Sequence, residues 1–235
     1  MYALILVGGR GERLRPLTDD APKPMVAVCG KPILEHIVSW LKAGGIKDIM
    51  FLAGYRWELV QKHFRDGTEY GFRAHYSIED FPLGRGGAIK QGMARLPMSK
   101  EPVLVMNGDI ITDMSIKELL SQHERNSRSK SCLLATIMTT RFRSPYGIVD
   151  LDDAGMVIGF REKPGLPFWV NGGVYVFSRD MEGHLPERGD HEDKFHNLAA
   201  SGALAAYRFE GYWRSIDSFK DLREVEDHIS GAVSS

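Results

Sequence analysis

The first residues that could do chemistry follow the apolar segment near the start of the chain. Gly8, Gly9 and Gly11 come directly after the apolar run 3–7, and Arg13 follows in the same loop. Glycines let backbone N–H groups approach anionic oxygens without interference from a Cβ atom. A guanidinium can bind a phosphate group through two parallel hydrogen bonds. We therefore predict a phosphate-binding loop; the alternative is an ordinary glycine turn with solvated arginines.

This loop differs from two well-known phosphate-binding patterns. It lacks the Gly-Lys-Ser/Thr ending of a P-loop. Arg15 stands near the third small residue of a dinucleotide fingerprint, and Pro16 interrupts any helix that would begin there. The segment 26–31, about twenty residues after the loop, contains no acidic residue for a ribose. A nicotinamide-binding oxidoreductase is therefore disfavoured.

Two further charged residues occupy defined places in the sequence. Lys23 lies between Pro22 and Pro24, and these prolines restrict the backbone on both sides of it. Asp109 follows the apolar run 103–106, which predicts a buried strand that delivers it to the carboxyl edge of a sheet. The alternatives are a surface Pro-Lys-Pro turn and a turn aspartate after a glycine. Beside the glycine loop, we favour a positioned cation at Lys23.

The elements that must position these residues follow from apolar periodicity. In the front half, buried runs predict strands at 3–7, 48–53, 74–78 and 103–106, with helices between them at 33–43, 57–64 and 87–94. In the rear half, the pattern predicts helices at 115–124, 191–200 and 221–228, strands at 132–138, 146–151 and 174–177, and a hairpin over 149–158. The alternation predicts an α/β protein with a Rossmann-like, mixed but mainly parallel sheet flanked by helices. We expect one domain over 1–235, with a nucleotide-binding half at about 1–110.

Composition and charge exclude several classes of protein. The 235 residues carry a formal net charge of −1, so no overall field favours nucleic acid or an anionic membrane. No apolar run approaches the ~20 residues of a membrane span, and the N-terminal segment reads as a strand rather than a signal peptide. Two cysteines cannot form a disulfide framework and suit a reducing compartment. We expect a cytoplasmic protein without nucleic-acid or membrane partners; a homo-oligomer stays open.

Several segments in fixed order resemble one enzyme family. GGRGERLRPLT followed by PKPM resembles the signature of the sugar-1-phosphate nucleotidylyltransferases, also called nucleotide-sugar pyrophosphorylases. YSIEDFPLGRGGAI, VMNGDI, YGIVDLDDAG, FREKP, VNGGVYVF and GYWRSID match later segments in the same order. The resemblance covers nearly the whole chain and is greatest to short mannose- or heptose-1-phosphate guanylyltransferases. It implies a fold of the nucleotide-diphospho-sugar transferase type, with a sugar-phosphate-binding half at about 111–235.

The resemblance implies a specific reaction. Such enzymes join a nucleoside triphosphate to a sugar 1-phosphate and release pyrophosphate. The attacking phosphate oxygen is already an anion, so no general base is needed, and the sequence shows no obvious Ser/His/Asp or Cys/His arrangement. Positioning and charge neutralisation then carry the catalysis. GTP is the favoured nucleotide; cytidylyl, thymidylyl or uridylyl transfer, or a non-catalytic regulatory paralogue that binds nucleotide-sugars, are the alternatives.

The resemblance also assigns residues to the nucleotide and the metal. Arg13 and Lys23 would bind the triphosphate and neutralise the transition state, and Asp109 with Asp217 would hold Mg²⁺. The alternative for Asp217 is a helix N-cap before 218–226. The remaining nucleotide-binding residues implied by the resemblance are Leu6, Gly8, Gly9, Gly11, Glu79, Gly84 and Gly108. Glu79 could accept hydrogen bonds from a guanine edge; its alternative is a solvated loop acid.

The implied sugar-phosphate residues lie in the rear half. Lys163 matches the lysine that holds the sugar phosphate, and Glu162 matches the acid that binds sugar hydroxyls. Tyr146 and Gly147 match a pair placed against the sugar, and Asn171 resembles a further sugar contact. The alternatives are an exposed charge run for 161–163, a strand-start aromatic at Tyr146 and a plain turn at Asn171.

Three departures from the family pattern leave the nucleotide preference open. Glu12 and Arg85 each replace a threonine, and Ser218-Phe219 stands where Gly-Thr is common. Arg85 could add a contact to a phosphate or a base. His191, Asp193 and His196 do not have the spacing of a tetrahedral zinc site, and we predict that they form a solvated helix face. Trp40 and Trp57 are predicted to pack helices onto the sheet, whereas Trp213 could line a sugar pocket or the core.

Overall fold

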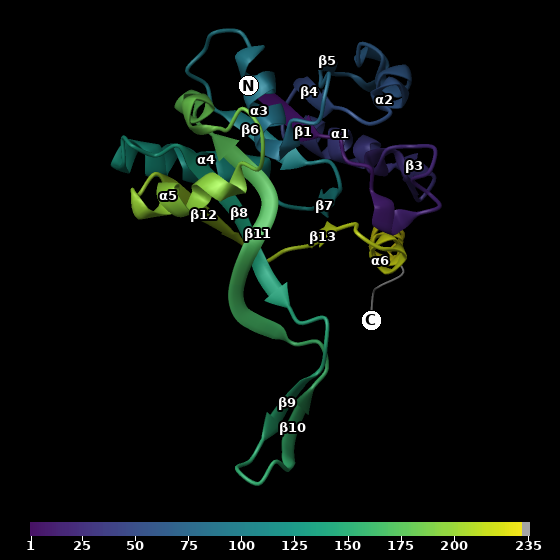
Figure 1. Ribbon diagram of the computed structural model, residues 1–235, viewed down its shortest axis with the longest axis vertical. Helices are drawn as coiled ribbons and strands as arrows, with labels where there is room; N and C mark the ends of the chain where they lie inside the picture. Colours follow the sequence, from purple (N-terminus) through teal and green to yellow (C-terminus); the bar gives the residue numbers. More distant parts are fainter. Residues whose placement is uncertain (232–235) are drawn as a thin grey trace.

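A seven-stranded sheet forms the centre of the molecule (Figure 1). The computed structural model describes residues 1–231. Across the sheet the strands run β12 (Leu204–Phe209), β8 (Ala135–Arg143), β11 (Gly165–Phe177), β6 (Val103–Asn107), β1 (Tyr2–Leu6), β4 (Asp48–Ala53) and β5 (Arg73–Ile78). Every neighbouring pair is parallel except the two that involve β11. The predicted α/β fold with a mixed, mainly parallel sheet is confirmed.

Both faces of the sheet are covered by helices. The helices are α1 (Ile33–Ala43), α2 (Trp57–Phe64), α3 (Gly84–Ala94), α4 (Ile116–Ser129), α5 (Phe195–Ala200) and α6 (Phe219–Ile229). One core joins the sheet to apolar residues of α1, α2, α4 and α6, and a second joins it to α3 and α5. Within the described residues 1–231, no helix combines the length and apolar character required to cross a bilayer.

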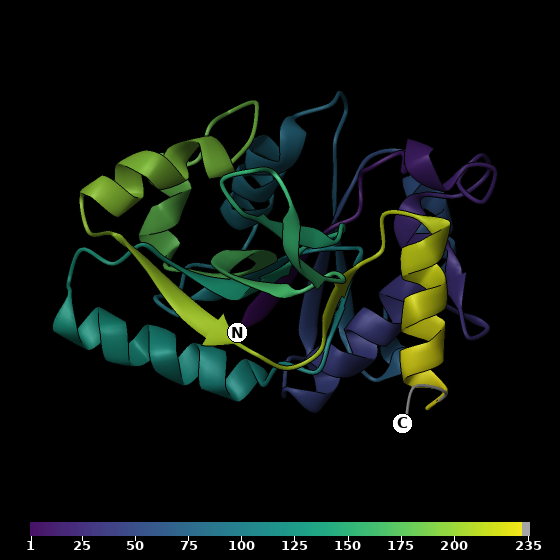
Figure 2. The same cartoon turned by 90° about the horizontal axis from the view of Figure 1, so that it is seen from below.

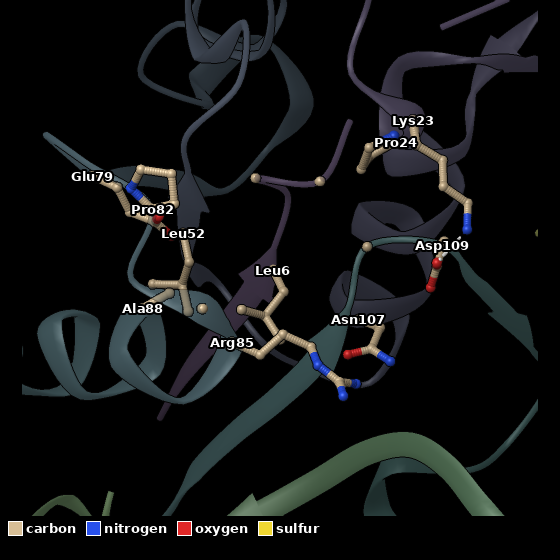
Figure 3. Close-up of a pocket in the computed structure, with 14 residues that line it drawn as sticks. Leu6, Lys23, Pro24, Leu52, Glu79, Pro82, Arg85, Ala88, Asn107 and Asp109 are labelled. Carbon is tan, nitrogen blue, oxygen red and sulfur yellow. Dashed lines mark hydrogen bonds and ion pairs between the residues drawn. The ribbon is translucent and has the colours of Figure 1, made fainter. Parts of the chain in front are cut away.

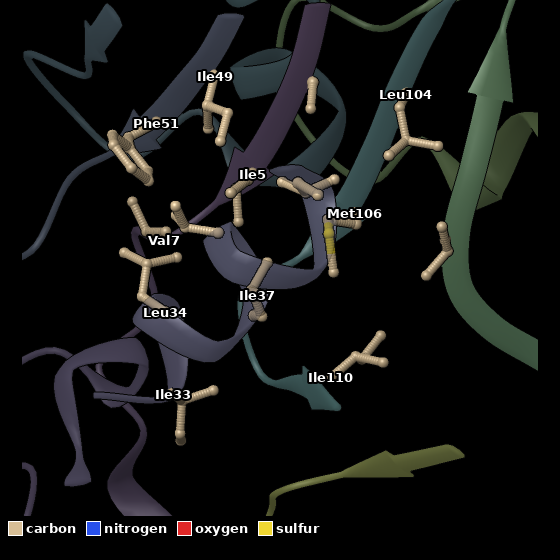
Figure 4. Close-up of a cluster of buried hydrophobic side chains, with 14 of the residues drawn as sticks. Ile5, Val7, Ile33, Leu34, Ile37, Ile49, Phe51, Leu104, Met106 and Ile110 are labelled. Atoms are coloured by element: carbon tan, nitrogen blue, oxygen red, sulfur yellow. The ribbon is translucent and has the colours of Figure 1, made fainter. Parts of the chain in front are cut away.

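Alternate residues of each central strand supply the two cores. In β1, Ile5 belongs to the core with α1, whereas Leu4 belongs to the core with α3. Figure 4 shows Ile5, Val7 and neighbouring strand residues around the α1 side chains Leu34 and Ile37. Burial on both faces explains why these strands read as continuous apolar runs.

A two-stranded arm extends away from this body (Figure 1). It is the antiparallel pair β9 (Ile148–Leu151) and β10 (Val157–Arg161), inserted between β8 and β11. An ion pair of 2.9 Å between Asp150 and Arg161 stabilises one face of the arm. The opposite face carries apolar side chains that are exposed: Val149, Leu151, Val157 and Phe160. The predicted hairpin is therefore confirmed.

Two pairs of short strands were not predicted from the apolar periodicity. The remaining strands are β2 (Ala27–Val28), β3 (Lys31–Pro32), β7 (Ile110–Thr112) and β13 (Trp213–Ser215). β2 pairs with β3, and β7 pairs with β13, which lies about a hundred residues later in the chain. The helix predicted at 191–200 is a 3₁₀ turn, Glu192–Lys194, followed by α5.

The prediction of a solvated face at this helix is wrong for His191. Its side chain is fully buried, packed against the rings of Tyr175, Phe177 and Phe195. His196 is exposed, as predicted. His191 precedes the 3₁₀ turn as its N-cap, and it lies four and seven residues before Phe195 and Leu198, which also face the core.

Candidate active site

The ammonium of Lys23 joins two carboxylates at the carboxyl edge of the sheet. Its Nζ lies 2.6 Å from Asp109 Oδ2 and 2.9 Å from Asp217 Oδ1. The Lys23 side chain is only 12% exposed. It begins the 3₁₀ turn Lys23–Met25, in which Met25 N donates to Pro22 O at 2.8 Å. The proline-flanked turn therefore fixes the base of this lysine, as the sequence predicts.

A short ladder brings Asp217 to the same place. β13 pairs with β7 in antiparallel register, and Ile216 N then donates to Asp109 O at 2.9 Å. Asp217 is the next residue, so its carboxylate emerges beside that of Asp109. Ser218, not Asp217, caps α6 by accepting a hydrogen bond from Asp221 N. The N-cap alternative for Asp217 is therefore wrong.

The glycine loop closes over the base of Lys23. Gly11 has φ +64°, and a Cβ at this position would lie 2.7 Å from Lys23 Cβ. Arg13 follows in the 3₁₀ turn Glu12–Leu14, and its Nη2 donates to Asp217 Oδ1 at 2.9 Å. The Arg13 side chain is 78% exposed. Two cations therefore share the carboxylate of Asp217, one buried and one at the surface.

The electrostatics of this cluster favour ionised carboxylates. Burial acts to raise the pKa of Asp217, but hydrogen bonds from Lys23 and Ser215, with the charges of Lys23 and Arg13, outweigh it and lower that pKa. The carboxylate of Asp217 is thus available at neutral pH to a cation or to Lys23.

Two carboxylates and no third acid converge at this edge. Among residues 1–231, no group of three or more His, Cys, Asp or Glu side chains forms a metal site. Asp109 Oδ1 is nevertheless buried and has no hydrogen-bond partner in the described chain. Hard divalent cations accept such a sparse set when substrate phosphates and water complete the shell. Asp109 and Asp217 therefore fit a divalent cation that arrives with a phosphate ligand.

A pocket of about 360 Å³ adjoins the cluster (Figure 3). Its lining includes these predicted residues: Leu6, Gly8, Gly9, Lys23, Glu79, Gly84, Gly108 and Asp109. Gly108 is required by close packing, because a Cβ there would lie 2.5 Å from Leu6 O. Gly11 and Arg13 are not among the lining residues. Most of the predicted nucleotide-binding residues thus surround one cavity, and Arg13 is connected to it through its contact with Asp217 beside Lys23.

Glu79 is part of the pocket wall rather than a solvated loop acid. Its Oε2 accepts a hydrogen bond from Leu83 N at 3.0 Å, which fixes the turn before α3. Burial raises the pKa of Glu79, and the Leu83 hydrogen bond only partly opposes this effect. Asp80, its neighbour, is exposed.

The first turn of α3 forms another wall and is held by a distant segment. Gly86 N donates to Gly189 O, and Gly189 N donates to Leu83 O, both at 2.8 Å. A Cβ on Gly84 would lie 2.7 Å from Gly189 O, so glycine is needed for this packing. The segment 186–192 is therefore fixed against the pocket.

Arg85 lines the pocket and is anchored by that segment. Its guanidinium donates to Asp190 Oδ2 through Nε at 2.8 Å and to Glu192 Oε2 through Nη2 at 3.0 Å. Glu192 Oε1 also accepts from Asn171 Nδ2 at 2.7 Å and from Tyr175 OH at 2.9 Å. Asn171 is thus held within a protein network that reaches Arg85.

The other four predicted sugar-phosphate residues lie at the base of the arm. A Cβ on Gly147 would meet Glu162 Oε2 at 3.3 Å, and Lys163 Nζ lies 3.3 Å from Glu162 Oε1. The side chain of Tyr146 is 76% exposed. None of the four is among the residues that line the pocket in the described chain. Gly147, Glu162 and Lys163 therefore lie together, outside the pocket that Lys23 and Asp109 line.

The sequence analysis missed one residue of the pocket, Asn107, and gave no firm role to another, Arg85. Asn107 ends β6 directly before Gly108-Asp109, and that position at a strand end was the available signal. Arg85 was noted as a departure in its motif that could add a contact to a phosphate or a base, and the structure places it in the pocket wall. Trp213 lies instead in a second hollow near the base of the arm, and its Nε1 donates to Gly172 O at 2.8 Å.

Comparison with known proteins places the chain in a family. The sequence model of the nucleotidyl transferase family matches residues 2–231. The chain belongs to this family. It is 35% identical over 230 residues to the mannose-1-phosphate guanylyltransferase catalytic subunit beta of Danio rerio, covering 94% of this chain and 62% of that protein. It thus spans about three fifths of the length of this curated relative.

Two other relatives match over most of their own length. The chain is 39% identical over 185 residues to D-glycero-alpha-D-manno-heptose 1-phosphate guanylyltransferase of Campylobacter jejuni, covering 77% of each protein. The crystal structure of HddC from Yersinia pseudotuberculosis superimposes with a TM-score of 0.75 at 25% identity, over 97% of this chain and 99% of that one. The resemblance to sugar-1-phosphate nucleotidylyltransferases is therefore confirmed at the level of the family.

Proposed function

We propose that the protein transfers a nucleotidyl group from a nucleoside triphosphate, with GTP favoured, to a hexose or heptose 1-phosphate. Pyrophosphate leaves and a nucleotide-sugar forms. The observation that carries this proposal is the convergence of Lys23, Asp109 and Asp217 beside the glycine loop and its pocket. The names of the Danio rerio and Campylobacter jejuni relatives support guanylyl transfer to a sugar 1-phosphate.

The chain's own residues supply the charge neutralisation. Gly8 and Gly9 offer backbone N–H groups to the triphosphate, while Lys23 and Arg13 face the charge that develops as pyrophosphate departs. The sugar phosphate attacks as an anion, so no side chain has to remove a proton. Because Lys23 is held at its base by prolines, its charge is positioned before substrate binds.

Asp109 and Asp217 would hold Mg²⁺. The unpartnered Asp109 Oδ1 and the ionised carboxylate of Asp217 are the oxygen ligands the chain offers. When bound, the ion would neutralise phosphate charge and orient the triphosphate.

The sugar side of the proposal involves the base of the arm. Lys163 would bind the phosphate of the sugar 1-phosphate, and Glu162 would accept hydrogen bonds from sugar hydroxyls. Tyr146, Gly147 and Asn171 would complete this side.

Two exposed cysteines, Cys29 and Cys132, are free, which suits our expectation of a reducing, cytoplasmic environment.

Pyrophosphate release tests the proposal directly. Purified protein with Mg²⁺ is given GTP, CTP, UTP or dTTP, each with mannose 1-phosphate, a heptose 1-phosphate or glucose 1-phosphate. We expect turnover with GTP and a manno-configured substrate to exceed the other pairs. Turnover with another base would retain the reaction class and replace the nucleotide. Nucleotide binding without turnover for any pair would overturn catalysis and favour the regulatory paralogue.

A further inference from the structure

A second hollow, of about 610 Å³, lies at the carboxyl end of β8 beside the base of the arm. Gly165 lines one side of it and follows Lys163 by two residues. Trp213 lines another side, at the start of the strand β13 that leads to Asp217. Figure 2 shows the chain that passes from β12 beside the arm to α6. The hollow is therefore bounded by the segments that carry the proposed sugar-phosphate lysine and one proposed metal ligand, and its volume is within the range of about 300–1,000 Å³ for small-molecule sites.

Three arginines gather on and beside the wall of this hollow. Arg141 and Arg143 line it from β8, and Arg208 lies on the adjacent strand β12. The guanidinium carbons of Arg141 and Arg208 lie 4.2 Å and 5.6 Å from the centre of the Trp169 ring, so these two side chains are on the same face of the sheet. Such stacking positions a guanidinium without neutralising it. We call Arg141, Arg143 and Arg208 the arginine cluster.

The arginine cluster keeps an excess of positive charge. Glu210 contacts Arg141 at 3.2 Å, whereas neither Arg143 nor Arg208 forms an ion pair with any residue between 1 and 231. Three cations therefore share one carboxylate. Like charges on neighbouring strands repel one another, and an anionic ligand would remove this repulsion.

The two anions of the proposed reaction are already placed elsewhere. The triphosphate is placed with Lys23, in a pocket that shares no lining residue with the hollow in the described chain. The 1-phosphate of the sugar is placed with Lys163. Neutral sugar hydroxyls need no cation, and the residues proposed for them are an acid, Glu162, and an amide, Asn171. Because a guanidinium fits the paired oxygens of a carboxylate or a phosphate, the arginine cluster fits a third anionic group.

We propose that the sugar 1-phosphate used by this protein carries a second anionic group, a carboxylate or a phosphate, on the part of the sugar remote from C1, and that Arg141 and Arg143 bind this group. The proposal rests on the proposed function and names its substrate class. Trp169 positions Arg141, while Arg143 offers a guanidinium that no carboxylate of residues 1–231 engages. Neither arginine belongs to the set that the sequence assigned to substrates.

Matched pairs of sugar phosphates test the proposal by binding alone. Binding is measured by calorimetry with Mg²⁺, both without nucleotide and with α,β-methylene-GTP, which cannot transfer its nucleotidyl group. The ligands are mannose 1-phosphate, mannuronic acid 1-phosphate and mannose 1,6-bisphosphate, and the three corresponding glucose compounds. We expect the acidic ligands to bind about 10- to 100-fold more tightly than the neutral ligand with the same ring. The tighter of the carboxylate and the bisphosphate identifies the group.

Substitution of the two arginines should remove this preference. In Arg143→Met and in Arg141→Met, we expect the ratio of the neutral to the acidic dissociation constant to fall below about threefold. Arg143→Lys keeps the charge but loses the planar fork, so it should retain part of the ratio. Arg143 is exposed, so its substitution tests a ligand contact rather than the fold. The matched control Arg128→Met, at an exposed arginine of α4, should keep the full ratio.

Equal binding of neutral and acidic ligands by the wild-type protein overturns the proposal, as does a failure to bind every one of these sugar phosphates. A ratio that survives in both Arg143→Met and Arg141→Met also overturns it, since these arginines would then not contact the second anionic group. Because the ratio is measured without turnover, a protein that shows it but releases no pyrophosphate with any substrate pair loses the proposed function and keeps this selectivity.

Discussion

The sheet edge and the arm carry charged residues in very different settings. At the edge, Lys23 is 12% exposed and contacts two carboxylates, with a third contact from Arg13 to Asp217. On the arm, Lys163 is half exposed and its contact is the adjacent Glu162. The first setting is assembled from residues separated by up to 204 positions, whereas the second comes from neighbours in sequence.

This difference bears on how the two substrates would be held. Charges at the edge are fixed by a buried sheet, so their geometry exists before a ligand arrives. Glu162 and Lys163 directly follow an antiparallel pair with an exposed apolar face, and an isolated two-stranded hairpin is only marginally stable in water. In our proposal the nucleotide side is therefore preorganised, while the sugar side would depend on where the base of the arm lies.

Asp109→Asn gives the largest expected effect and tests the sheet edge. The amide keeps the shape but removes the charge that faces Lys23 and that would face the proposed divalent ion. We expect kcat/KM for pyrophosphate release to fall by about 10³-fold, with an unchanged melting temperature. Asp180→Asn, at an exposed position, is the control. Activity within tenfold of wild type would show that this edge does not neutralise the reacting phosphates.

His191 tests the buried segment that anchors Arg85. Burial lowers the pKa of His191 to about 4. The positive charge of Arg85 adds to this effect, whereas the negative charges of Asp190 and Glu192 oppose it. Between pH 6.5 and pH 4, His191 therefore binds more protons in the unfolded state than in the folded state. Its contribution to the free energy of unfolding is complete above pH 6.5 and is lost as the pH falls toward 4. We expect a loss of about 3 kcal/mol over that range by denaturant unfolding.

The His191→Leu variant should lose this pH dependence, and His196→Leu should retain it, because His196 is exposed. Equal pH slopes in wild type and His191→Leu would mean that His191 is solvated in the folded protein. The segment 186–192 would then be as loosely held as the arm.

The front half of the fold was predictable because its strands are buried on both faces. β4, α1 and α2 have the predicted bounds, since continuous apolar runs and helical spacing determine them directly. The position of the arm was not predictable. Its hairpin follows from local alternation and a turn, but its direction depends on how β8 and β11 leave the sheet. The predicted strand 174–177 is only the last part of the 13-residue β11.

The sequence identified residues of the candidate site, but it did not show how Asp217 comes to lie beside Lys23 and Asp109. Lys23 and Asp109 stood out because prolines and a buried strand fix their backbones. Asp217 reaches them through β7 and β13, which have three residues each and show no periodicity. Asn107 was overlooked because an amide before a glycine reads as a turn residue. An unsatisfied oxygen can be recognised only when its surroundings are known.

Lys163→Ala tests the arm with a smaller effect. A charge-assisted hydrogen bond to phosphate contributes about 1.5–3 kcal/mol, so we expect KM for the sugar 1-phosphate to rise about 10- to 100-fold. KM for the triphosphate should change less than about twofold, since Lys163 lies outside the pocket lining of the described chain. Lys117→Ala on α4 is the matched control. An equal rise in both KM values would contradict the separation of the two substrate sides.

A pair of valines gives the smallest effect and the sharpest contrast between arm and sheet. Val176 in β11 is fully buried, whereas Val157 in β10 is 62% exposed. Val176→Ala should lower the free energy of unfolding by about 2 kcal/mol through lost burial and a cavity. Val157→Ala should change it by less than about 0.5 kcal/mol, because its methyl groups already contact water. Urea unfolding of both variants measures the difference. Equal destabilisation would mean that the apolar face of the arm is covered in solution, so the base of the arm, with Lys163, would be held as firmly as the sheet edge.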